Sequence, residues 1–317
     1  MKSIVLLDGG VGQEIYRRAG KPAHPMWSVE VMINQPDLVR EVHKDFIRAG
    51  ASVITINSYT CTPTRLKRDG DPTPFASLQN QAATIAATAR AELGSMAAGV
   101  QIAGCLPPLF ASYTADKRSF ATLKEEYKQI VAVQDPLVDI FLIETISSIK
   151  EARAAVEAAQ PSGKAIYLSF TLSDTEAHRL RSGETIGAAM QAMSGYPLGA
   201  VMINCSLPET IQEGLQTLKQ WHKPFGAYAN AFTSVAPLKP GGTVDQLSGR
   251  ADMDQQQYAQ HAMAWIRQGA SLIGGCCEVS PSHIDYLRQQ IQAAGYNLVS
   301  LNQLHPPVTC QIRSPKN

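Results

Sequence analysis

Short apolar runs alternate with longer amphipathic segments along the whole chain. The runs predict buried strands, since each ends at a glycine or a polar residue, and the segments between them predict helices. The predicted strands are Ile4–Leu7, Ser52–Ile56, Val100–Ala103, Ile140–Ile143, Ala165–Phe170, Gly199–Asn204, Phe225–Ala229 and Ala270–Gly275. The predicted helices include Asp37–Ala49, Phe75–Leu93, Leu123–Asp135, Ile149–Ala159, Thr185–Met193, Pro208–Trp221 and Gln255–Gln268.

This repeat of strand and helix predicts a single α/β domain, a (β/α)8 TIM barrel, and 317 residues are a common length for one. The alternative is an open doubly wound sheet, whose first strand is typically followed by a phosphate-binding G-x-G-x-x-G loop. Gly9-Gly10-Val11-Gly12 does not match that pattern. We therefore expect residues 1–304 to form the barrel and residues 305–317 to form a C-terminal tail.

The amino-acid composition indicates which binding partners and which cellular compartment to expect for the protein. A formal net charge of +1 gives no reason to expect a nucleic-acid partner. No apolar run reaches the roughly 18 residues that a membrane span needs, and the first residues do not resemble a signal peptide. The six cysteines are then expected to be thiols or metal ligands rather than a disulfide framework, in a cytoplasmic protein.

Polar and sulfur-bearing residues stand at the ends of the predicted strands. In a TIM barrel the carboxyl ends of the strands meet at one mouth, so these side chains are expected to converge. They are Asp8, Asn57, Cys105, Glu144, Cys205, Asn230, Cys276 and Cys277.

The pair Cys276-Cys277 follows two glycines, and Cys205 closes another predicted strand. Three thiolates with an open fourth position match a catalytic zinc site, so these three residues are the predicted Zn²⁺ ligands. One alternative is that a cysteine is simply a small buried apolar residue, which we expect of Cys61, Cys105 and Cys310. Another is a redox disulfide between the two neighbours, which is geometrically awkward.

Asp8 and Glu144 are the candidate acids of the mouth. Asp8 has the alternative role of capping the next helix, whereas Glu144 directly follows an apolar run and is expected to lie deep. Two carboxylates suit a substrate ammonium group, and the backbone amides of Gly9 and Gly10 suit a carboxylate. An α-amino acid that carries a thiol would satisfy the whole site.

These residues resemble the zinc-dependent homocysteine S-methyltransferase family, which is related to the betaine–homocysteine enzymes. The resemblance extends from Leu7 to about Leu287. Its most specific motif is Gly274-Gly-Cys-Cys277 together with the upstream pair Asn204-Cys205. Further matches are Trp27-Ser28, Asn57-Ser58-Tyr59, Glu144-Thr145, Ser169-Phe170 and Pro281-Ser-His-Ile284.

The resemblance implies a barrel in which Cys205, Cys276 and Cys277 hold zinc and the thiol of L-homocysteine is methylated to give methionine. Asp8 and Glu144 would be the catalytic pair that binds the homocysteine ammonium group, and Gly9 and Gly10 would bind its carboxylate. Asn57 and Asn230, both at strand ends, are expected to contact substrate. The partners are then small molecules, in a monomer or small homo-oligomer.

The methyl donor is left open. S-methylmethionine or S-adenosylmethionine is favoured, and a betaine or dimethylsulfonium compound is the alternative. The loop Ala229-Asn-Ala-Phe-Thr233 departs from the Pro-Asn-Ser-Gly-Glu of short-chain members, and only its Asn230 is shared. A zinc hydrolase and a non-catalytic zinc or redox sensor are the competing functions. The all-sulfur ligand set disfavours the hydrolase, and the acid pair disfavours the sensor.

Overall fold

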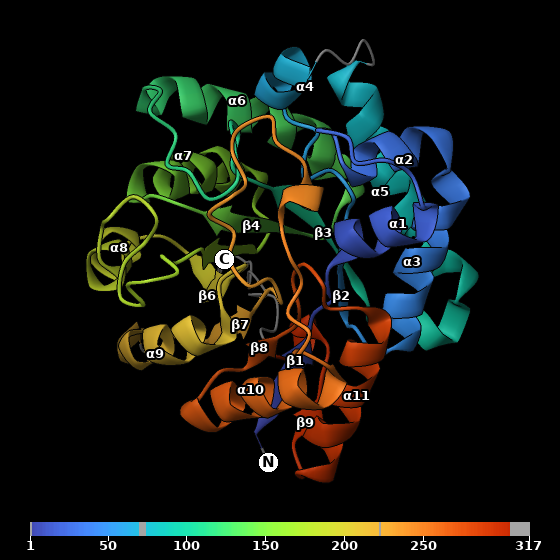
Figure 1. The fold of residues 1–317 in the computed structure, drawn as a ribbon, viewed down its shortest axis with the longest axis vertical. Coiled ribbons are helices and arrows are strands. Elements are labelled where there is room, and N and C mark those ends of the chain that lie inside the picture. Colours follow the sequence, from blue (N-terminus) through green and yellow to red (C-terminus); the bar gives the residue numbers. More distant parts are fainter. Residues whose placement is uncertain (1, 70–73, 222, 305–317) are drawn as a thin grey trace, which may run out of the picture.

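The computed structural model describes residues 2–69, 74–221 and 223–304, so the predicted tail at 305–317 lies outside the described residues. Parallel strands form a central barrel, and helices surround it (Figure 1). The prediction of a TIM barrel is confirmed. The strands are β1 (Ser3–Leu6), β2 (Val53–Thr55), β3 (Gln101–Leu106), β4 (Ile140–Ile146), β5 (Ile166–Phe170), β6 (Leu198–Asn204), β7 (Phe225–Tyr228), β8 (Leu272–Ile273) and β9 (Asn297–Leu298).

Each barrel strand is followed by at least one helix. Most helices begin at a proline or a capping Ser, Thr or Asp, as at Ser148, Thr185 and Asp254, whose side chains accept a backbone amide of the first turn. The helices are α1 (Val11–Ala19), α2 (Ser28–Asn34), α3 (Pro36–Arg48), α4 (Pro63–Asp69), α5 (Phe75–Glu92), α6 (Phe120–Gln134), α7 (Ile149–Ala159), α8 (Ile186–Met193), α9 (Pro208–Leu218), α10 (Gln255–Gln268), α11 (Pro281–Ala293) and α12 (Leu301–Leu304).

The strand order is β2-β3-β4-β5-β6-β7-β8-β1-β9, all parallel. The barrel closes between β1 and β2. There the Ser52 amide donates to the Leu6 carbonyl at 2.8 Å, and the Asp8 amide donates to the Val53 carbonyl at 3.0 Å. The carboxyl ends of β1 and β2, and the residues that follow them, are thereby fixed side by side.

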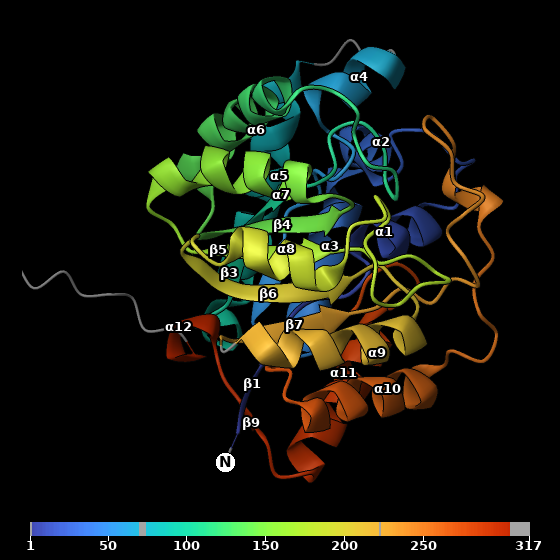
Figure 2. The same ribbon diagram turned by 90° about the vertical axis from the view of Figure 1, so that its left-hand side faces the viewer.

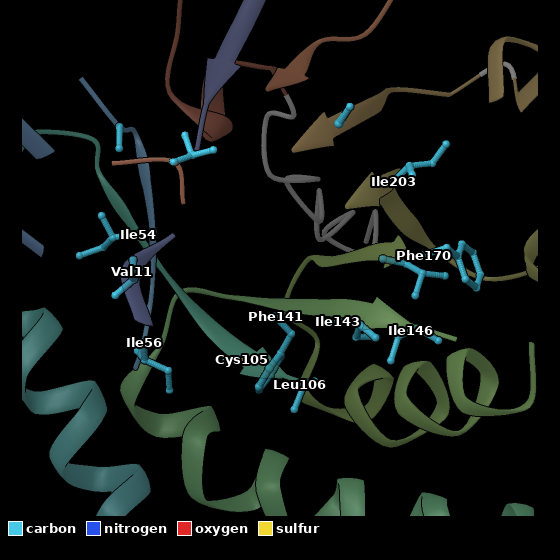
Figure 3. Packing of buried hydrophobic residues seen from close by; sticks show 14 of the residues in the cluster. Val11, Ile54, Ile56, Cys105, Leu106, Phe141, Ile143, Ile146, Phe170 and Ile203 are labelled. Carbon is cyan, nitrogen blue, oxygen red and sulfur yellow. The ribbon is translucent and has the colours of Figure 1, made fainter. Parts of the chain in front are cut away.

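The core has two layers, separated by the strands. Alternate residues of β1 show this directly, because Ile4 and Leu6 belong to the layer under the helices while Val5 and Leu7 belong to the barrel interior. Figure 3 shows part of the outer layer, where Ile54, Phe141 and Ile203 come from three different strands.

The amino end of the barrel is closed by two elements that the sequence reading did not predict. Strand β9 pairs with the amino half of β1, on the same edge that β2 uses further along. Helix α12 follows directly, and its Leu301 is 2% exposed within the interior layer. Access to the barrel interior is therefore from the carboxyl end.

Two strands are longer than predicted. Cys105 lies inside β3, and Glu144 lies inside β4, whose register with β5 shifts between Ile143 and Ile146. A long loop between β7 and α10 contains one 3₁₀ turn, Val244–Gln246. Figure 2 shows this loop, in orange, along the right-hand edge of the view, over one end of the barrel.

Candidate active site and metal centre

A cavity of about 120 Å³ lies at the carboxyl end of the barrel. Residues from strand ends line its floor, and α4 and the loop after β7 contribute to its wall. Of the residues predicted at the mouth, the lining includes Asp8, Gly9, Gly10, Asn57, Glu144, Cys205, Cys276 and Cys277. Segments far apart in sequence therefore meet at one cavity, as the strand-end pattern predicted.

The sulfur atoms of Cys205, Cys276 and Cys277 lie within 4.8 Å of one another. Cys205 and Cys276 are joined as a disulfide, so the expectation of thiols or metal ligands alone is wrong for this pair in this structure. The physical reason is that β6 and the turn after β8 bring the two α-carbons to 5.6 Å, within the range of disulfides. Reduction of that bond would give a cluster of three thiols whose donor chemistry suits a soft metal ion.

The turn that carries Cys276 and Cys277 packs against the start of α1. A Cβ at Gly10 would lie 2.5 Å from the Cys276 carbonyl oxygen, so this close approach requires glycine. The hydroxyl of Tyr258 in α10 donates to the Gly274 carbonyl at 2.6 Å and accepts from the Ala229 amide at 3.2 Å. These contacts fix the two cysteines relative to β1 and β7.

Cys205 is held by its neighbours in β4 and β6. The side chain of Asn204 accepts from the Thr145 amide and donates to the Thr145 hydroxyl, both at 2.9 Å, which clamps the ends of the two strands together. The hydroxyl of Tyr113 lies 3.1 Å from the sulfur of Cys205. The sequence reading missed Tyr113, because it lies in a loop after β3 with no motif around it.

Five non-glycine residues in the described part of the chain have positive φ angles: Trp27, Tyr113, Thr145, Cys205 and Glu278. Thr145 and Cys205 lie in or next to strand ends of the mouth, and Glu278 directly follows the cysteine pair. Such conformations cost about 1–3 kcal/mol each and cluster at functional sites. Their grouping here supports the assignment of this end of the barrel as the active site.

Both predicted acids are at the cavity. Asp8 is 6% exposed, and its Oδ2 accepts from the Thr55 amide at 2.7 Å. Burial raises the pKa of Asp8 well above its usual range, against the lowering effect of that hydrogen bond. Burial raises the pKa of Glu144 to about 7, although the Cys105 thiol donates to its Oε1 at 3.0 Å. Within the described residues no ion pair involves either acid, so a cation that enters the cavity would find uncompensated carboxylates.

The backbone amides of Gly9 and Gly10, both predicted to bind a carboxylate, differ in their hydrogen bonding. The Gly10 amide donates to the Val279 carbonyl at 2.8 Å, so the expectation that it binds a carboxylate is wrong in this structure. The Gly9 amide has no acceptor among the described residues. Helix α1, which begins one residue after Gly10 with no side-chain cap, adds the amide of Gly12 at the cavity.

The side-chain amides of Asn57 and Asn230, both predicted to contact substrate, form hydrogen bonds with loop segments instead. Asn57 lines the cavity, but its Oδ1 accepts from the Ser28 hydroxyl at 2.6 Å and its Nδ2 donates to the Ser28 carbonyl at 3.0 Å. It therefore fixes the segment that carries Trp27. Asn230 is buried outside the cavity lining, and its Oδ1 accepts from the Phe232 amide at 3.1 Å. The structure does not place Asn230 in contact with a molecule in the cavity.

Aromatic and cationic groups complete the wall. Trp27 and Tyr59 meet edge to face with ring centroids 6.4 Å apart, and Phe232 comes from the loop after β7. Arg65 of α4 also lines the cavity. Sequence reasoning missed Arg65, because α4 was not predicted and an arginine in a short polar segment gives no signal of burial.

A protein-family model described as homocysteine S-methyltransferase matches residues 5–291. The chain is similar to the homocysteine S-methyltransferase of Escherichia coli (strain K12), with 29% identity over 307 residues that cover 90% of this chain and 95% of the relative.

Its fold is similar to crystal structures of the homocysteine methyltransferase MmuM from Escherichia coli. The metallated form has 28% identity and a TM-score of 0.76, and covers 90% of this chain and 96% of that chain. The oxidized form has 27% identity with the same TM-score and coverage. That relative has thus been obtained both with metal and in an oxidized state.

Proposed function

This chain belongs to the homocysteine S-methyltransferase family, and we propose that it uses Zn²⁺ to transfer a methyl group from a small onium donor to L-homocysteine, giving methionine. The observation that carries the proposal is the convergence of three cysteines and two acids in one cavity. We propose S-methylmethionine or S-adenosylmethionine as the donor.

The cysteine cluster fits a catalytic zinc ion. After reduction of the Cys205–Cys276 bond, Cys205, Cys276 and Cys277 would supply three thiolates and leave room for a substrate atom. Burial raises the pKa of the Cys277 thiol to about 12, so a positive ion is needed to keep it deprotonated at neutral pH. The metal would supply the Lewis acidity that deprotonates the homocysteine thiol, whose ordinary pKa leaves little thiolate at pH 7.

The acids provide a site for the ammonium group of homocysteine. Asp8 and Glu144 share the cavity, and burial raises the pKa of both carboxyl groups. An ammonium group between them would supply a positive charge and favour their ionised forms. The carboxylate would then lie at the Gly9 amide and the uncapped start of α1, where backbone amides and the helix dipole favour an anion.

The rest of the chain aligns the reactants. Trp27, Tyr59 and Phe232 form an apolar, aromatic wall that suits a sulfonium or ammonium centre through cation–π attraction. The Tyr113 hydroxyl, beside the Cys205 sulfur, is placed to donate to that thiolate. Holding two reactants in line while excluding water is the main contribution that a protein can make to such a displacement.

There is one alternative for the methyl donor and one for the function of the protein. A betaine or dimethylsulfonium donor would use the same aromatic wall. A non-catalytic zinc or redox sensor is favoured by the Cys205–Cys276 disulfide alone. The acid pair counts against it, because sensing by thiols needs no ammonium site.

The partners follow from the same site. We propose that they are homocysteine and a diffusible donor, with no nucleic acid or membrane involved, in a cytoplasmic monomer or small homo-oligomer. Among the described residues, no helix has the length and apolar character to cross a membrane.

The test is methionine formation by the reduced, zinc-loaded protein. Homocysteine is supplied with S-methylmethionine, S-adenosylmethionine, glycine betaine or a dimethylsulfonium compound in separate reactions. Turnover with one donor establishes the reaction and the donor together. Failure to bind homocysteine with zinc in place would contradict the proposal and favour the sensor.

A further inference from the structure

Arg65 is a buried cation at the edge of the active-site cavity. It lies in α4, between β2 and α5, and is 5% exposed. It lines the cavity together with Tyr59 and Ser112. Neither the metal cluster nor the acid pair uses this residue, so its presence needs a separate explanation.

The guanidinium of Arg65 donates hydrogen bonds only to neutral groups, although Asp69 and Arg68 lie close enough to affect its pKa electrostatically. Its Nε and Nη2 donate to the Pro108 carbonyl at 3.2 and 3.0 Å, Nη2 lies 3.4 Å from the Ser112 hydroxyl oxygen, and its Cζ is 5.3 Å from the Tyr59 ring centroid. In residues 2–69, 74–221 and 223–304, Nη1 has no hydrogen-bond acceptor, and no carboxylate forms an ion pair with Arg65. The neighbouring Asp69 is paired with Arg68 instead, at 2.7 Å.

A buried charge without a counter-ion is costly and is rarely kept without a function. Burial lowers the pKa of Arg65, but a guanidinium stays protonated at any ordinary pH. The free Nη1 and the cavity beside it therefore form a ready site for an anion. A carboxylate suits this site, since its oxygens accept charge-assisted hydrogen bonds from a guanidinium.

We propose that Arg65 binds the carboxylate of the methyl donor, so that the donor is an onium compound with its own carboxylate. This inference rests on the proposed function. The onium centre would lie against the Tyr59 and Trp27 rings, and the carboxylate would reach the guanidinium that stacks on the same Tyr59. Arg65 is then a specificity-determining residue, which selects donors by a negative charge remote from the reacting methyl group.

Homocysteine is the less suitable occupant of this position. A site for its ammonium and carboxylate groups is already available elsewhere in the cavity. Asp8 directly precedes Gly9 and the start of α1, which provides both groups at one place. Arg65 lies instead on α4, beyond the ring of Tyr59.

The experiment compares each donor with an analogue in which a neutral amide replaces the carboxylate. S-methylmethionine and S-methylmethionine amide are titrated by calorimetry into the reduced zinc protein and into Arg65→Gln, and the pair dimethylsulfonioacetate and its amide is treated likewise. For at least one pair we expect the wild type to prefer the acid by about 10- to 100-fold, and Arg65→Gln to show almost no preference. Homocysteine affinity should not change in the variant.

Arg68→Gln is the matched control. Arg68 lies on the same helix and donates to the Phe110 carbonyl at 2.6 Å, but it does not line the cavity, so this variant should keep the preference for the acid. Arg65→Lys, which keeps the charge, should restore part of it. An equal preference in wild type and Arg65→Gln, a loss confined to homocysteine affinity, or no binding of either acid would overturn the inference. Charge-dependent binding without any methyl transfer would instead contradict only the proposed function.

Discussion

Glu144 is a partly buried acid that lines the cavity and has no ion-pair partner among the described residues. Replacing it by Gln keeps the shape and removes the charge, so homocysteine should bind about 10- to 100-fold more weakly, as expected for the loss of a charge-assisted hydrogen bond. Zinc content should remain at one ion per chain. The measurement is homocysteine affinity by calorimetry together with metal analysis. Unchanged affinity would remove Glu144 from the ammonium site.

The same variant should lack a pH-dependent loss of stability that the wild type shows. Burial raises the pKa of Glu144 from 4.5 to about 7 in the folded protein, so the native state binds the extra proton between those values. Stability contributed by this group is present below pH 4.5 and falls as the pH rises through about 7, by at most about 3 kcal/mol. In the absence of ligand, Glu144→Gln should therefore gain stability relative to wild type as the pH rises through this window, measured by denaturant unfolding.

Cys277 is the cysteine of the cluster that takes no part in the disulfide. Cys277→Ala should lower zinc affinity by more than about 100-fold, because a direct ligand matters more than the outer partners whose loss costs 10- to 100-fold. The barrel should stay folded, since the side chain lies at the mouth. Cys61→Ala is the control, because Cys61 does not line the cavity. Retention of a full equivalent of zinc by Cys277→Ala would show that the ligand set is different.

At the scale of elements, the Tyr258 hydroxyl joins α10 to the ends of β7 and β8. Tyr258→Phe leaves a buried carbonyl at Gly274 and a buried amide at Ala229 without this partner, which costs about 1–3 kcal/mol for each group. We expect a lower unfolding temperature and also weaker zinc binding, because Gly274 is two residues from Cys276.

Tyr127→Phe separates those two effects. Tyr127 is equally buried, and its hydroxyl donates to the Pro107 carbonyl at 2.9 Å, away from the cysteine turn. It leaves one buried carbonyl without a partner, so it should lose about 1–3 kcal/mol of stability with zinc affinity unchanged. Equal zinc affinities in the two variants would show that Tyr258 is purely structural.

The helices and strands also show how much of the fold can be predicted from the sequence. Periodicity predicted the eight barrel strands and most helices, because burial on both faces leaves long apolar runs. It missed α4, β9 and α12, which are short and whose roles depend on tertiary contacts, such as Leu301 in the barrel interior. Polar and sulfur-bearing residues at the carboxyl ends of barrel strands are expected to converge, and this expectation found Asp8, Glu144 and the three cysteines. It did not show that Gly10 donates elsewhere, that Asn230 faces its own loop, or that Arg65 is buried.

At the scale of the whole molecule, the barrel holds the metal cluster between segments more than 70 residues apart, since Cys205 and Cys276 are separated by 71 positions. Strands β6 and β8 are fixed by the closed sheet, so we expect that the fold brings the cysteines together without a metal. Protein treated with a chelator should therefore stay folded, unlike small domains that need zinc to fold.

Zinc should nevertheless add stability, and only after reduction. While Cys205 and Cys276 are joined, their sulfurs cannot act as thiolates, so oxidised protein should bind no zinc at this site. After treatment with a thiol-free reductant, one equivalent should bind, and free zinc at 100 times its Kd should add about 2.7 kcal/mol. Thermal unfolding with and without zinc, before and after reduction, measures both effects. Zinc-dependent stabilisation of the oxidised protein would place the metal elsewhere, whereas its restriction to the reduced protein would show that the Cys205–Cys276 bond controls metal binding at this site.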